Sequence, residues 1–154
     1  MIKQTIYIEK IGWLIHAYSH KSKYDVDDIM EKLYDLGCDG DTARKAFENL
    51  MNDSLNTGLC YSNYRHRESV LVVGRASSAD EFFNSIVHEL THLQGHICDV
   101  IGLDPKGEEI AYYMGDLSRD IYPSISHLLC DCCRNKEEYG KQKEKSGYSY
   151  YGIG

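Results

Sequence analysis

The sequence lacks any hydrophobic run long enough to cross a membrane. A membrane-spanning helix needs roughly 20 consecutive apolar residues, and the longest apolar runs of this 154-residue chain are much shorter. The first residues lead into an alternating segment and not into an apolar signal core with a small-residue cleavage site. We therefore expect a cytoplasmic protein that does not associate with membranes.

The sequence also has fewer basic than acidic residues. The chain has 17 Lys and Arg residues against 24 Asp and Glu residues, a formal net charge of −7, and no basic stripe. Phosphate backbones repel an acidic protein, so nucleic acid is not an expected partner. The hydrophobic content of 42% and the charged content of 27% are instead typical of a globular domain.

The chain has no internal repeat and no linker that would divide it. Its length is sufficient for one domain with a hydrophobic core. We expect that domain over residues 1–134. Residues 135–154 are charged and then rich in Tyr and Gly, so we expect a polar tail that is solvated or loosely docked.

The hydrophobic pattern predicts an α+β fold. Residues 5–19 alternate in part and contain Gly12, which favours two short strands or one kinked strand. Residues 57–63 and 68–75 are rich in β-branched side chains and predict two further strands. Asp25 and Asp41 are candidate N-caps for two short helices, the first ending at Gly37.

Two helices are predicted in the second half of the chain. Ser78 and Glu81 form a candidate capping box for a long helix that ends at Gly102. The next helix starts near Glu108 and runs to Ile121, before Pro123. A further helical piece is expected to about residue 133.

The six cysteines, at positions 38, 60, 98, 130, 132 and 133, predict no disulfide framework in a cytoplasmic protein. Three of them fall in the segment CDCC at 130–133. A structural metal site normally has four ligands with turn-type spacing such as C-x-x-C pairs. Buried or incidental thiols are therefore favoured over a second metal site.

The most informative motif is HELTH, residues 88–92, which matches H-E-x-x-H within the predicted long helix. His88 and His92 lie on one helix face about 6 Å apart along the axis. Both imidazoles can therefore reach one zinc ion. Glu89 points to the side, where it can take the proton of a zinc-activated water during attack on a carbonyl. The pattern predicts a hydrolytic Zn²⁺ site with Glu89 as the general base.

A catalytic zinc ion usually has three protein ligands. His96 lies about 12 Å from His88 along a straight helix, so it can be a ligand only if the helix breaks at Gly95. Cys98 completes H-E-x-x-H-x-x-G-x-x-C, which resembles the metzincin pattern with Cys in the place of the final His. The apolar periodicity around Cys98 favours an ordinary buried thiol over this route.

Glu108, in KGEEIAYYMGDL, is the preferred third ligand. Together with HELTH, the sequence E-x-x-A that starts at Glu108 resembles the gluzincins, in which a second helix supplies a Glu ligand and a small residue lets the two helices approach. Glu109 is the alternative ligand. Tyr112 stands where the family often has Asp, and both acids also suit the first turn of a helix.

Among gluzincins, the chain looks most like the compact minigluzincins and small zincin-like proteins, over roughly residues 68–130. The resemblance implies a small twisted sheet packed on the H-E-x-x-H helix and on the following Glu-bearing helix. The strand at 68–75 would be either an edge strand that pairs with substrate or an ordinary core strand. The implied function is zinc-dependent hydrolysis of peptide or protein substrates. The alternatives are a zinc-binding regulatory or interaction module without turnover, and a small domain without metal.

Overall fold

The N-terminal alternating segment forms an antiparallel hairpin in the computed structural model, which describes residues 1–135. Strand β1 covers Ile2–Ile8 and strand β2 covers Trp13–Lys21. Between them lie a short 3-10 helix, η1 (Glu9–Ile11), and Gly12, whose φ of +61° is a left-handed conformation that glycine adopts without strain. The two-strand version of the prediction is therefore confirmed.

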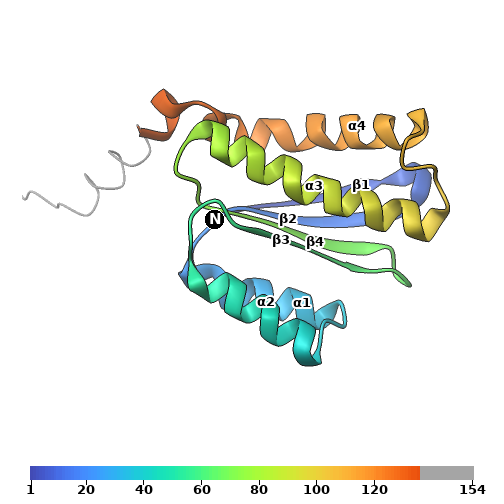
Figure 1. Ribbon diagram of the computed structural model, residues 1–154, viewed down its shortest axis with the longest axis horizontal. Coiled ribbons are helices and arrows are strands. Elements are labelled where there is room, and N and C mark those ends of the chain that lie inside the picture. The colour runs from blue at the N-terminus through green and yellow to red at the C-terminus, as the bar shows by residue number, and fades with distance from the viewer. Residues whose placement is uncertain (136–154) are drawn as a thin grey trace, which may run out of the picture.

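Strands β3 (Gly58–Asn63) and β4 (Glu68–Gly74) complete a four-stranded mixed sheet with the order β1-β2-β4-β3 (Figure 1). Strand β4 pairs in parallel with β2 and antiparallel with β3. It is covered on both faces, which accounts for its nearly continuous apolar sequence. The strand at 68–75 is thus a core strand, and β3 is the edge strand on this side.

Helices α1 (Val26–Asp35) and α2 (Gly40–Asn52) cover one face of the sheet (Figure 1). A short 3-10 helix, η2 (Lys23–Asp25), precedes α1. The predicted cap of α2 is wrong, because the helix starts at Gly40 and Asp39 is its N-cap. Asp41 lies in the first turn and forms an ion pair of 2.6 Å with Arg44.

Helices α3 (Ala79–Ile101) and α4 (Glu108–Ile125) pack side by side on the opposite face, so the fold has three layers (Figure 1). The backbone N–H of Glu81 donates to the Ser78 side chain at the start of α3, and Gly102 ends the helix with a φ of +71°. Both predicted ends are confirmed. Helix α4 ends later than predicted, because Pro123 is accommodated in its last turn, and a 3-10 helix, η3 (Ser126–Leu129), follows.

Each helical layer has its own hydrophobic core against the sheet. Trp13 is completely buried in the α3/α4 layer, and its indole N–H donates to Ser69 Oγ at 2.8 Å. The α+β class predicted from the sequence is confirmed by this arrangement. Within the described residues, none of the helices combines the length and apolarity needed to cross a bilayer. The predicted tail, apart from residue 135, lies outside the described residues.

Candidate functional site

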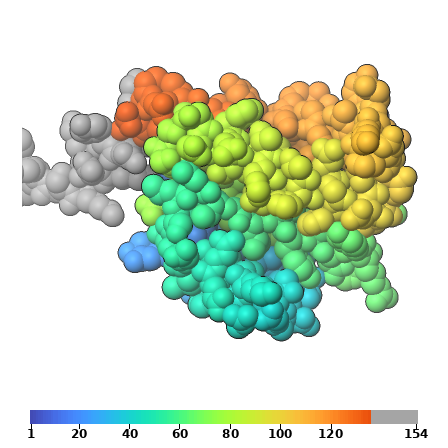
Figure 2. All heavy atoms as spheres, viewed as in Figure 1, coloured from blue at the N-terminus to red at the C-terminus, as the bar shows by residue number. Residues whose placement is uncertain are grey.

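His88 and His92 lie on the exposed side of α3, one turn apart. Their Nε2 atoms are 3.2 Å apart, and their ring centroids are 4.9 Å apart in an edge-on arrangement. With zinc–nitrogen bonds of about 2.1 Å, this spacing corresponds to an N–Zn–N angle of about 99°, close to tetrahedral. The pair therefore fits two positions of a zinc coordination shell. Figure 2 shows that no other element covers α3 in that view.

Glu89 lies on a different side of α3, because adjacent helical residues are rotated by about 100°. It is only 5% exposed, and it faces Gly58 at the start of the edge strand β3. Among residues 1–135, its carboxylate has no hydrogen-bond or ion-pair partner. Burial raises the pKa of Glu89, and the charge of His88 partly offsets this effect. The group is thus suited to holding a proton.

The absence of a side chain at Gly58 makes room for Glu89. A Cβ at Gly58 would lie 2.5 Å from Glu89 Oε1 and 2.6 Å from its Cγ, which are impossible contacts. The carbonyl oxygen of Gly58 accepts a hydrogen bond of 3.2 Å from the Asn49 side chain of α2. Strand β3 is therefore fixed from one side by α2 and approached closely by Glu89 from the other.

A pocket of about 270 Å³ opens where α2, the chain before β3, and α3 meet. His88 and Glu89 line it together with Gly58. The rest of its lining is polar and uncharged, consisting of Asn49, Asn56, Thr57, Asn84 and Ser85. The structure thus brings a predicted metal ligand and the predicted general base to one solvent-accessible hollow.

Glu108 is not part of this arrangement. Gln94 lies about 200° around the helix from His92 and donates to the carbonyl oxygen of Pro105, near the start of α4. Helix α4 therefore begins on the side of α3 opposite to His92. Glu108 and Ala111 are both exposed, so the E-x-x-A sequence does not form the expected close contact between the helices.

The alternative ligands are also placed elsewhere. Glu109 accepts a hydrogen bond of 2.9 Å from the Tyr113 hydroxyl. Helix α3 continues through Gly95, so His96 does not turn back toward the pair, and its Nδ1 lies 2.8 Å from Ser62 Oγ of β3. Cys98 is buried, and burial raises the pKa of its thiol, as expected for an ordinary core cysteine. No three-ligand group that contains His88 and His92 forms within the described chain.

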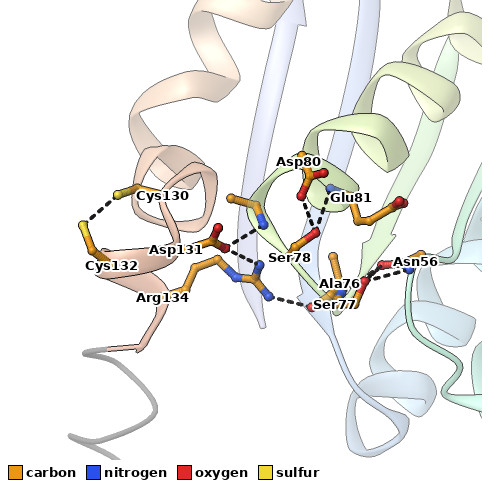
Figure 3. A network of polar contacts seen from close by, with 11 residues as sticks. Asn56, Ala76, Ser77, Ser78, Asp80, Glu81, Cys130, Asp131, Cys132 and Arg134 are labelled. Atoms are coloured by element: carbon orange, nitrogen blue, oxygen red, sulfur yellow. Dashed lines mark hydrogen bonds and ion pairs between the residues drawn. The ribbon is translucent and has the colours of Figure 1, made fainter.

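The described chain contains a different group of side chains that could hold a metal ion, namely the thiols of Cys130, Cys132 and Cys133. Their ligand atoms all lie within 4.8 Å of one another. Cys132 is exposed and the other two are half-buried, so of the expected buried or incidental thiols the structure excludes only the first alternative. Figure 3 shows this segment beside the start of α3.

Neither a family model, nor a curated protein, nor a solved structure matches this chain. The roles of Gly58 and Asn49 were not predicted from the sequence. A glycine at the start of a strand is a recognisable sign of close approach by another group. The group that approaches, Glu89, is 31 positions away in the sequence, and only the fold brings the two together.

Proposed function

We propose that the chain is a zinc-dependent hydrolase of peptide bonds, with the metal held by His88 and His92 and with Glu89 as the general base. The observation that carries the proposal is the largely buried Glu89 side chain, which lines the same solvent-accessible pocket as His88. Burial raises the pKa of the Glu89 carboxyl group, because it disfavours the charged form. Perturbed acids at a pocket are characteristic of catalytic sites.

When bound, zinc would polarise the substrate carbonyl and acidify a water molecule. Glu89 would accept a proton from the attacking water on a carboxylate oxygen and return it to the leaving amine. Its raised pKa suits this shuttle, because the carboxylate then binds the proton more tightly than an exposed Glu would. Gly58 positions Glu89 by leaving space for its side chain.

The edge strand β3 supports a peptide as the substrate. Among the described residues it pairs with β4 alone, and its first residue lies against Glu89. An edge strand offers backbone groups with which an extended peptide can form main-chain hydrogen bonds. A peptide on β3 would pass close to the pocket shared by His88 and Glu89. We also propose that the α+β fold is zincin-like, as the resemblance in the sequence implies.

One observation favours a second function, a metal-binding regulatory or interaction module without turnover. Catalytic zinc sites generally have three protein ligands, whereas only two imidazoles meet at this site among residues 1–135. Such a module would retain zinc through His88 and His92. Glu89 would then have no catalytic role.

The test is to purify the full chain, measure its zinc content, and screen a peptide library by mass spectrometry. We expect zinc binding that is lost in the double variant His88→Ala/His92→Ala. Glu89→Gln should keep the zinc and lose cleavage. Glu108→Gln is the matched control, because the same substitution away from the pocket should preserve both.

The outcomes separate the two functions. Zinc binding without cleavage by the unsubstituted chain would favour the module. A chain that takes up no zinc would refute both. Loss of zinc in Glu108→Gln would show that α4 rearranges to supply the ligand expected from the sequence.

A further inference from the structure

We propose that Cys130, Cys132 and Cys133 form a binding site for Cu(I), separate from the histidine pair. The sulfur atoms of Cys130 and Cys132 are 2.9 Å apart, and those of Cys132 and Cys133 are 3.9 Å apart. The third pair also lies within 4.8 Å. Three thiols therefore converge on one point of the surface, where Cys132 is exposed and solvent can deliver an ion.

The spacing fits three metal–sulfur bonds after a small movement. With bonds of about 2.3 Å, three sulfurs around one ion in a plane lie about 4.0 Å from one another. The Cys132–Cys133 distance already has this value. The Cys130–Cys132 distance must open by about 1.1 Å, which rotation of the exposed Cys132 side chain can provide.

The segment that carries the thiols is fixed to the start of α3 (Figure 3). Asp131 Oδ1 accepts a hydrogen bond of 2.9 Å from the backbone N–H of Ala79. Arg134 donates to the carbonyl oxygen of Ala76 at 2.6 Å and forms an ion pair with Asp131. The backbone N–H groups of Cys133 and Arg134 both donate to the carbonyl oxygen of Cys130. These contacts hold the turn in the shape that gathers the sulfurs.

The donor set favours Cu(I) over zinc. Structural zinc normally has four ligands, whereas the group within residues 1–135 has three thiols and no fourth His, Cys, Asp or Glu donor. The only carboxylate within the segment, Asp131, is engaged by Ala79 and Arg134. Thiolates select soft ions, and Cu(I) is a soft d¹⁰ ion that accepts low coordination numbers. Binding would form three Cu–S bonds and release the thiol protons to solvent, with copper remaining Cu(I).

The test uses the reduced full chain under anaerobic conditions. Cu(I) is titrated against a chromophoric Cu(I) chelator, and copper X-ray absorption reports the ligands. We expect a single Cu(I) per chain with a first shell of sulfur only, at about 2.3 Å. Cys132→Ser should weaken binding by at least the roughly 10–100-fold that the loss of an outer-sphere partner costs. Cys60→Ser, the same substitution at a half-buried cysteine of β3 outside the group, should leave Cu(I) binding unchanged.

Further variants test the anchoring of the turn and separate this site from the histidine pair. Asp131→Asn keeps an acceptor for the Ala79 N–H and should keep Cu(I), whereas Asp131→Ala should weaken binding by about tenfold. His88→Ala/His92→Ala should keep Cu(I), so failure of the zinc proposal leaves this proposal standing. No competitive uptake, equal affinity in Cys132→Ser, or nitrogen in the copper shell would each overturn the proposal.

Discussion

Substitution of Gly58 by alanine should displace Glu89. The added Cβ would lie 2.5, 2.6 and 2.7 Å from Oε1, Cγ and Cδ of the Glu89 side chain. Comfortable contacts between carbon atoms are about 3.5–4.0 Å, so one of the two groups must move by about 1 Å. Because Cγ is also too close, rotation of the carboxylate alone cannot relieve the clash. Overpacking of this kind typically costs about 1–3 kcal/mol of unfolding free energy.

Urea denaturation of a double-mutant cycle would measure this contact. Gly58→Ala should destabilise the native background but not a Glu89→Ala background, so the coupling energy should be about 1–3 kcal/mol. Gly95→Ala is the control, since a Cβ there meets nothing within 4 Å. It should stabilise α3 by about 0.5–1 kcal/mol. If Gly58→Ala costs the same in both backgrounds, the close approach of Glu89 to β3 is refuted.

Two further predictions concern buried polar groups. Glu89→Gln should alter the pH dependence of the free energy of unfolding. Burial raises the pKa of Glu89 in the folded state above its ordinary value of 4.5, so the folded state binds the proton more tightly than the unfolded state does. The stabilisation from the protonated Glu89 is complete below pH 4.5 and is lost as the pH rises through the folded-state pKa. Gln cannot ionise, so urea titrations of the metal-free proteins should show Glu89→Gln gaining stability relative to the native chain across this pH range. Ser69→Ala should cost about 1–3 kcal/mol, because it leaves the buried Trp13 indole N–H without its acceptor. In calorimetry, Ser69→Ala should cost less in a Trp13→Phe background, which lacks the indole N–H, and an equal cost in both backgrounds would contradict the prediction.

The sequence predicted the elements well where local chemistry determines them. Ser78 and Gly102 fix the ends of α3, because a side-chain acceptor and a residue with positive φ are local requirements. The strand order was not predictable in the same way. The apolar run of β4 suits either an edge strand with one buried face or a central strand with two, and only the helices on both sides of the sheet make it central.

The same distinction between local and tertiary determinants applies to the residues of the candidate site. The spacing of His88 and His92 follows from one helical turn, so the sequence predicted their approach. The third ligand depends on how α4 returns along α3, which no local pattern encodes. The chain turns back after α3, and the hydrogen bond from Gln94 to Pro105 places the start of α4 on the side of α3 opposite to His92. A Glu in the first turn of α4 therefore lies on the side of α3 that faces away from the histidine pair.

The burial of Glu89 distinguishes this site from two incidental histidines on a helix surface. A motif that arose by chance on an exposed helix face would leave its Glu side chain exposed, whereas Glu89 is only 5% exposed. Here the fold places Glu89 beneath an edge strand, and the strand has a glycine at the one position where a Cβ would collide with it. Burial raises the pKa of Glu89 and so disfavours its charged form, and such local conflicts are expected at functional sites. The Glu89–Gly58 contact is therefore stronger support for chemistry at this pocket than the spacing of the histidines.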